Sequence, residues 1–216
     1  MNLFKKKTAQ NIKYIAFSFD DGPNNDNTLK ILKTLKKHNG KATFFLLGSR
    51  IENYSINANM YSKYNCEIGN HTWMHDDAKS NDANYILNSI IECQNTIEKV
   101  YKTKTKLMRP PGGNLNSDLF DNLKKYGLSI ILWSIDAKDW NTKDINSIVM
   151  NVLKNAHDGD IVLMHDMKKE TIEALKAILS ELEKQGYAFV TISELFKLKG
   201  ISLEPGKIYK SARQNL

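Results

Sequence analysis

The chain has 216 residues, of which 41% are hydrophobic and 25% charged, a composition ordinary for a globular protein with one substantial core. No apolar run approaches the roughly 20 residues of a membrane-spanning helix, which excludes an integral membrane protein. The 31 basic and 24 acidic side chains give a net charge of +7, which favours anionic partners without choosing among them. Because the lysines are scattered over several predicted helices, we expect no nucleic-acid binding.

Strands and helices alternate along the chain. Tyr14–Phe19 reads as a buried strand, and Thr28–Asn39 as an amphipathic helix that Gly40 ends. Further strands are predicted at 42–47, 66–69, 106–109, 128–133, 161–164 and 187–191, and further helices at 49–64, 84–101, 117–125, from 144, and at 170–185. About seven strand–helix units predict an α/β fold with a parallel sheet. Because the chain has no glycine-rich dinucleotide-binding turn, we expect this sheet to close as a TIM-like (β/α) barrel.

One domain accounts for most of the length. We expect an N-terminal tail over residues 1–12, a single catalytic domain over 13–200 and a loose C-terminal tail over 201–216. Met1–Gln10 lacks the apolar core and cleavage site of a secretory signal. The protein is therefore expected to be cytoplasmic, or extracellular and wall-associated if an upstream signal or anchor has been removed. A monomer is expected.

The two cysteines, Cys66 and Cys93, are too few for a disulfide framework or a thiolate zinc site. Two buried thiols are favoured over a bridge between them.

Residues with chemical functions follow the predicted strands, where the loops of a (β/α) barrel converge on one mouth. They are Asp20 and Asp21 after the first strand, His71 and His75 after the third, Arg109 after the fourth, Asp136 and Asp139 after the fifth, and His165 after the sixth. This placement predicts one active site at that mouth.

A metal site is predicted from Asp21, His71 and His75. The two histidines stand four residues apart in HTWMH, so that on one helical turn both imidazoles would face the same cation. Catalytic zinc commonly takes three nitrogen and oxygen ligands and leaves one position for water. One divalent ion is expected, zinc first, with cobalt, nickel and manganese as alternatives. Taken alone, the histidine spacing is more typical of core or surface residues than of a metal site.

Adjacent aspartates in FDDGP suit different roles, because neighbouring side chains of a strand diverge. Asp21 would bind the metal while Asp20 takes a proton from its water. Arg109 would hold Asp20 ionised through a bidentate hydrogen-bond pair. A turn or helix cap is the alternative for the aspartates, and a surface turn for the arginine.

The remaining candidates would handle the substrate. Two prolines stiffen the loop in RPPGG, and the first backbone donor after Pro111 is Gly112, which could face an oxyanion. His165, tuned by Asp139, could protonate a leaving amine. Trp140 and Leu163 would form an apolar notch for a methyl group. His38 and His157 are expected to be structural or solvated.

The segments FDDGPN, HTWMH, RPPGG, DAKDW and LMHD, in this order, resemble the NodB-homology polysaccharide deacetylases, carbohydrate esterase family four. The similarity covers roughly Tyr14–Leu198. It implies a distorted (β/α) barrel, with Asp20 as general base, His165 as general acid, and a metal on Asp21, His71 and His75. It also implies that Arg109 tethers Asp20, that Asp139 tunes His165, and that Trp140 and Leu163 receive the acetyl methyl.

The resemblance implies a metal-dependent hydrolase that removes N-acetyl groups from a glycan polymer, with peptidoglycan N-acetylglucosamine as the leading substrate. The alternatives are N-acetylmuramic acid or chitin-type oligomers, a non-catalytic glycan-binding barrel, and an amidase for a small non-sugar amide. Two positions depart from the family pattern: Ser18 replaces a usual threonine, and Gly112 stands where many members carry tyrosine. Gly112 would leave one wall of the groove open.

Overall fold

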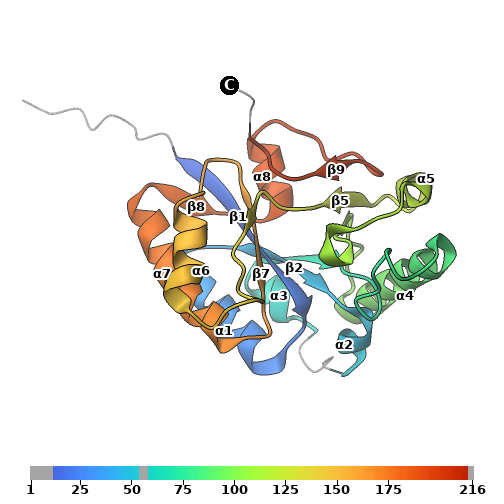
Figure 1. Ribbon diagram of the computed structural model, residues 1–216, viewed down its shortest axis with the longest axis horizontal. Helices are drawn as coiled ribbons and strands as arrows, with labels where there is room; N and C mark the ends of the chain where they lie inside the picture. Colours follow the sequence, from blue (N-terminus) through green and yellow to red (C-terminus); the bar gives the residue numbers. More distant parts are fainter. Residues whose placement is uncertain (1–11, 54–57, 214–216) are drawn as a thin grey trace, which may run out of the picture.

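The structure is a computed structural model that describes residues 12–53 and 58–213 (Figure 1). In these two ranges, no helix combines the length and the apolar character that crossing a membrane requires.

The described residues form one sheet, in which each pair of neighbouring strands is parallel. Its strands are β1 (Lys13–Gly22), β2 (Ala42–Leu46), β3 (Glu67–Asn70), β4 (Leu107–Met108), β5 (Ser129–Ile131), β6 (Ile135–Asp136), β7 (Ile161–His165), β8 (Tyr187–Phe189) and β9 (Ile208–Tyr209). The spatial order is β6-β7-β1-β2-β3-β4-β5-β9, with β8 beside the start of β1. This curled parallel sheet with its helices confirms the distorted (β/α) barrel.

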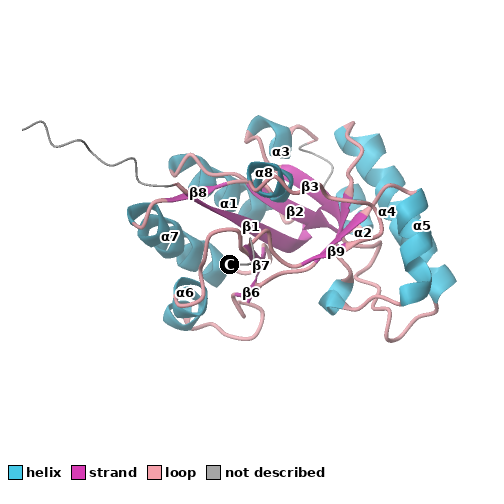
Figure 2. Ribbon diagram, turned by 90° about the horizontal axis from the view of Figure 1, so that it is seen from above, coloured by secondary structure: helices cyan, strands magenta, loops and turns pink. Residues whose placement is uncertain are grey.

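The helices are α1 (Asn25–Lys37), α2 (Gly48–Asn53), α3 (Met60–Lys63), α4 (Ala83–Tyr101), α5 (Phe120–Lys125), α6 (Ile145–Leu153), α7 (Lys169–Lys184) and α8 (Ile192–Leu198), with two 3₁₀ turns, η2 (Pro111–Gly113) and η3 (Ser117–Leu119). Figures 1 and 2 show α1, α6 and α7 together on one flank, and α4 and α5 on the other. The helix expected over 49–64 is instead the two short helices α2 and α3, and residues 54–57 of that prediction lie outside the described residues.

The two faces of β1 explain why the site forms inside the barrel. Ile15, Phe17 and Phe19 pack in the cluster that contains residues of α1, α6 and α7. Ala16 points the other way, into a cluster with residues of β5, β7 and α8. Because side chains alternate along a strand, Asp20 shares the inner face with Ala16.

Helix α8 covers the amino ends of the central strands. The Ile192 N–H donates to Thr43 Oγ1 at 2.9 Å at the start of β2, and the Ser193 N–H donates to Glu67 at 3.2 Å at the start of β3. A capping box formed by Thr191 and Glu194 starts the helix. With this end closed, the carboxyl ends of the strands form the mouth of the barrel.

The C-terminal segment differs from the predicted loose tail. Strand β9 pairs with β5, and the Ala212 N–H donates to Gly159 O at 2.7 Å. Arg213 Nη2 lies 2.7 Å from the fully buried carboxylate of Asp160, just before β7. The segment therefore joins β5 to the start of β7, and the domain extends to Arg213. A strand of two residues has no periodicity that sequence reading could detect.

Candidate active site

Asp20 and Asp21 lie at the carboxyl end of β1, where the strand bends. Asp21 has a φ of 71°, and the ladder with β2 shifts register between Phe19 and Gly22. Asp20 Oδ2 lies 3.7 Å and Asp21 Oδ1 3.5 Å from the same atom, His71 Nε2. The expectation that the two carboxylates diverge is therefore wrong, because the left-handed backbone at Asp21 breaks the alternation of the strand.

The ring of His71 has a defined orientation. His71 directly follows β3 and is buried, and its Nδ1 lies 2.7 Å from Arg109 O. A carbonyl oxygen can only accept, so Nδ1 carries a hydrogen, and Nε2 is the ring nitrogen that faces the carboxylates. This is the second hydrogen bond that a metal-ligating histidine normally needs.

His75 reaches the site from a loop, which corrects the predicted helical turn. Thr72 and His75 both have positive φ, 70° and 64°, and the segment between β3 and α4 contains no helix in the described residues. Asp76 organises the loop: its carboxylate accepts from the Met74 N–H at 3.0 Å, and its own N–H donates to Thr72 Oγ1 at 2.9 Å. The ring centroids of His71 and His75 still come within 5.2 Å.

The ligand atoms of Asp21, His71 and His75 all lie within 4.8 Å of one another. Asp21 Oδ1 is buried and accepts no hydrogen bond from the described residues, so this oxygen is available to a cation. Burial raises the pKa of Asp21, but the neighbouring His71, followed by the charges of His165 and His75, outweighs burial and lowers the pKa to about 2. An ionised oxygen and two imidazole nitrogens fit a divalent cation.

Arg109 is fully buried behind Asp20. Its Nη1 donates to Asp20 Oδ1 at 2.8 Å, while Nε and Nη2 donate to Ile131 O at 3.1 Å and Leu132 O at 3.0 Å. The predicted contact is thus confirmed, but the bidentate geometry is wrong, because two backbone carbonyls take the other donors. The guanidinium also lies 4.2 Å from the ring centroid of Phe45.

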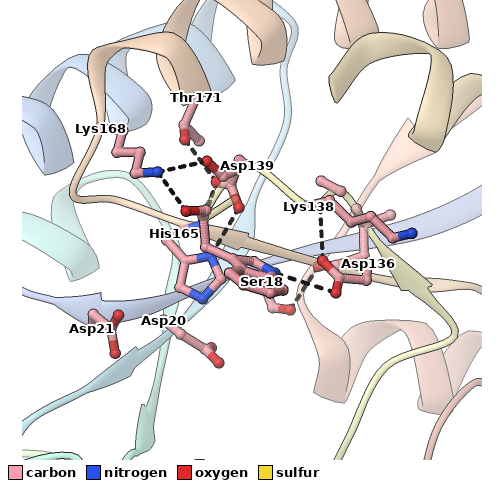
Figure 3. Close-up of polar contacts among 12 residues, drawn as sticks. Ser18, Asp20, Asp21, Asp136, Lys138, Asp139, His165, Lys168 and Thr171 are labelled. Atoms are coloured by element: carbon pink, nitrogen blue, oxygen red, sulfur yellow. Dashed lines mark hydrogen bonds and ion pairs between the residues drawn. The ribbon is translucent and has the colours of Figure 1, made fainter. Parts of the chain in front are cut away.

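His165 faces Asp20 and Asp21 from β7, with Asp139 behind it (Figure 3). His165 Nδ1 lies 2.8 Å from Asp139 Oδ1, and the His165 N–H donates to Asp139 Oδ2 at 2.8 Å. Thr171 Oγ1 donates to the same Oδ2 at 2.6 Å. Asp139 is therefore held by three hydrogen bonds. Because His165 contacts Asp139 through Nδ1, Nε2 is the ring nitrogen that can take part in the chemistry.

The charge state of His165 follows from these neighbours. Burial lowers the pKa of His165, but the hydrogen bond and charge of Asp139, with the charges of Asp20 and Asp21, raise it to about 9. The imidazole therefore holds a proton at neutral pH that it can donate.

One cavity of about 400 Å³ collects these groups. Its walls include the two aspartates, the two loop histidines and His165, together with Gly112, Trp133, Asp136, Trp140 and Leu163. The predicted partners Trp140 and Leu163 thus share a cavity, with Trp140 exposed and Leu163 buried. Trp133 was not predicted as a site residue, although an aromatic residue two positions after an apolar strand is a usable signal.

Gly112 forms part of the cavity wall in a left-handed conformation, with a φ of 59°. A Cβ atom there would lie 2.8 Å from Asn114 Nδ2. Pro111, the residue before it, is buried and starts η2. Gly112 therefore contributes only backbone atoms to the cavity wall.

Four other residues lie outside this cavity. His38 pairs with Glu183 at 2.8 Å, and His157 Nδ1 contacts Asn155 O at 2.7 Å. Cys66 and Cys93 are both free thiols, and burial raises their pKa values to about 11 and about 12. Neither the histidines nor the thiols bear on the chemistry of the site.

Comparison with known proteins places the chain in one family. Residues 7–131 match the polysaccharide deacetylase family. A peptidoglycan-N-acetylglucosamine deacetylase of Bacillus cereus is 41% identical over 198 residues, which cover 89% of this chain and 92% of that protein. The peptidoglycan-N-acetylmuramic acid deacetylase PdaC of Bacillus subtilis is 38% identical over 92% of this chain, which spans only 42% of the length of PdaC.

Solved structures agree with the sequence matches. The structure of PdaC aligns with a TM-score of 0.83 and 37% identity over 88% of this chain and 93% of that chain. A family 4 acetyl xylan esterase from Clostridium thermocellum, solved in complex with a cobalt ion, aligns with a TM-score of 0.85 and 34% identity over 94% of this chain and 100% of that one. With its curled parallel barrel and strand-end residues, the chain belongs to the polysaccharide deacetylase family of hydrolases.

Proposed function

We propose that the protein removes N-acetyl groups from the amino sugars of a polysaccharide, with N-acetylglucosamine of peptidoglycan as the substrate. The observation that carries this proposal is the opposed placement of two proton-handling groups in one cavity. Asp20, held by Arg109, and His165, held by Asp139, both border the cavity that contains Asp21, His71 and His75.

This arrangement suits hydrolysis of an amide. A divalent cation, zinc in our proposal, would supply Lewis acidity to the carbonyl and to water when bound by Asp21, His71 and His75. Asp20 accepts the proton of the attacking water, and Arg109 keeps that carboxylate oriented. The Gly112 N–H donates to the developing oxyanion. His165 Nε2 donates its proton to the leaving amine, so that acetate and a free amino sugar result.

The apolar part of the cavity suits an acetyl group. Trp140 and Leu163, with Trp133, supply the apolar walls next to the polar groups. A methyl group buried there contributes about 1 kcal/mol of binding free energy. The net charge of +7 suits the anionic bacterial wall. We therefore propose that the protein works at the cell wall. We also propose a monomer, because every group of the proposed site comes from one chain.

The test is acetate release from N-acetylglucosamine oligomers and peptidoglycan by protein loaded with zinc or cobalt. We expect wild type to release acetate, Asp20→Asn to bind metal without activity, and His71→Ala to lose both metal and activity. No release from any acetylated glycan, with bound metal demonstrated, would overturn the proposal and leave a glycan-binding barrel. Release only from small non-sugar amides would indicate an amidase instead.

N-acetylmuramic acid is the second candidate for the deacetylated sugar, because PdaC is named for that activity. Gly112 adds no side chain to the cavity wall, which would favour a bulkier sugar than N-acetylglucosamine. Comparing acetate yields from chitin oligomers, peptidoglycan and muramic acid-containing fragments distinguishes these substrates.

A further inference from the structure

A second hollow adjoins the cavity of the proposed active site. It measures about 360 Å³, within the range of ligand sites, and Ser49, Arg50, Met74 and Met167 contribute to its walls. Asp21 and His75 line both this hollow and the active-site cavity, so the two spaces meet at the proposed metal ligands. A polymer whose acetyl group occupies the first cavity can therefore extend a neighbouring unit into the second.

Arg50 distinguishes this hollow chemically. The chain has three arginines, and two of them have carboxylate partners: Arg109 with Asp20 and Arg213 with Asp160. Among the described residues, Arg50 has no carboxylate oxygen within 4.0 Å and is only partly buried. Its Nη1 lies 2.8 Å from Met167 Sδ, and Asn24 Nδ2 lies 3.8 Å from the same sulfur. Met167 thus positions the guanidinium without neutralising its charge, and the charge acts on the buried carboxyl of Asp166 only from beyond ion-pair distance.

The remaining walls suit the face of a sugar. Met74 is 65% exposed at the rim, and methionine adapts its shape to a partner. Ser49 adds a hydroxyl next to Arg50 in sequence. An arginine that forms no direct ion pair favours a planar anion that it can bind through two parallel hydrogen bonds.

We infer that this hollow is a subsite for a carboxylate-bearing sugar next to the deacetylated one, with Arg50 as the residue that recognises the carboxylate. The inference rests on the proposed function. It names the substrate class as an acidic glycan in which an N-acetylated sugar alternates with one that carries a free carboxylate. A muramic acid unit without its stem peptide has this chemistry, whereas chitin oligomers are neutral throughout.

The experiment compares three substrates of equal length: neutral N-acetylglucosamine oligomers, glycan strands freed of stem peptides, and the same strands with their carboxylates amidated. We expect Arg50→Gln to lower kcat/KM about 10-fold or more on the carboxylate strands, mainly through KM, because a charge-assisted hydrogen bond is lost. On the neutral and amidated substrates the change should stay below about 2-fold. Lys79→Gln, the same loss of charge at an exposed site on the loop of His75, is the control and should resemble wild type.

The outcomes separate the two proposals. Equal loss on all three substrates, or no loss on any, overturns the subsite and leaves the deacetylase proposal intact. If wild type hydrolyses no glycan, the proposed function fails, and equilibrium binding of the carboxylate strand to wild type and Arg50→Gln still tests the subsite. Thermal unfolding of each variant identifies a change that reflects a damaged fold rather than a lost contact.

Discussion

Arg109 and Asp20 are joined by one hydrogen bond, from Nη1 to Oδ1 at 2.8 Å, while Oδ2 of the same carboxylate faces His71 Nε2 at 3.7 Å. The two oxygens of Asp20 thus have different neighbours. One is fixed by a permanent charge, and the other points toward the proposed metal ligands. Burial outweighs the opposing effect of Asp20 and lowers the pKa of Arg109, but the guanidinium keeps its charge because arginine is protonated at any ordinary pH.

Removal of Arg109 should damage both stability and catalysis. Arg109→Met leaves the carboxylate of Asp20, which is 3% exposed, without its counter-charge. Breaking a buried pair in this way costs about 3–5 kcal/mol of unfolding free energy. Denaturant titration measures the loss, and acetate release should become undetectable. Lys106→Met, at an exposed position just before β4, is the control and should cost less than about 0.5 kcal/mol. Equal stability of the two variants would contradict the role given to Arg109.

Metal binding should depend on the ligand set rather than on histidine content. Loss of a side chain that supports a ligand typically weakens metal affinity 10- to 100-fold, so loss of a ligand should weaken it by about 100-fold or more. We expect this of Asp21→Ala and His75→Ala in a competitive zinc titration. His38→Ala, which removes a histidine that pairs with Glu183 and does not line the cavity, should bind zinc as wild type does. Tight zinc binding by Asp21→Ala would refute the ligand set.

The activity should have an alkaline limit set by His165. A general acid works in its protonated form, which is present below its pKa and lost as the pH rises through it. With a pKa of about 9, His165 is protonated at neutral pH, and kcat should fall above about pH 9. Asp139→Asn removes a charge that raises this pKa, so the alkaline limb should move to lower pH. An unshifted limb in Asp139→Asn would show that another group sets it; NMR titration of the His165 ring checks the assignment directly.

The sequence predicted which residues meet at the mouth of the barrel, because side chains at the carboxyl ends of parallel strands gather at one end of a barrel. The local geometry was less accessible. The four-residue spacing of His71 and His75 suited a helix, but hydrogen bonds of Asp76 and two left-handed residues bring the rings together in a loop.

Contacts between segments that are far apart in the chain account for most of the features that the sequence did not predict. The hollow beside Arg50 depends on Met167, which is 117 positions away in the chain. The support of Asp139 by Thr171 joins a loop to α7. Neither contact has a local pattern, because each arises only after the strands have set the relative positions of the loops.

Gly112 should be required for the shape of the site more than for folding. A side chain at its φ of 59° is strained, and Gly112→Ala should lower the unfolding free energy by about 1 kcal/mol. Gly127→Ala is a matched control: its φ is 72°, and its Cβ atom would meet nothing within 4 Å. Both variants should lose similar stability in denaturant titrations, while only Gly112→Ala should lose kcat/KM for acetate release. An equal and unchanged kcat/KM in both would contradict the claim that Gly112 is needed for the shape of the site.

The ion pair between Arg213 and Asp160 should hold the C-terminal segment on the barrel. Asp160 is fully buried and also accepts from Ser134 Oγ at 2.7 Å and from the His157 N–H at 2.8 Å. Arg213 is partly exposed, which weakens its charge interaction, so we expect Arg213→Ala to cost about 1–2 kcal/mol of unfolding free energy. Lys210→Ala, at an exposed position on the same segment, should cost less than about 0.5 kcal/mol. Zinc affinity should stay unchanged in both, since the segment lies at the start of β7 and the proposed metal ligands at the carboxyl ends of the strands. A loss of zinc binding in Arg213→Ala would show that the segment supports the site itself.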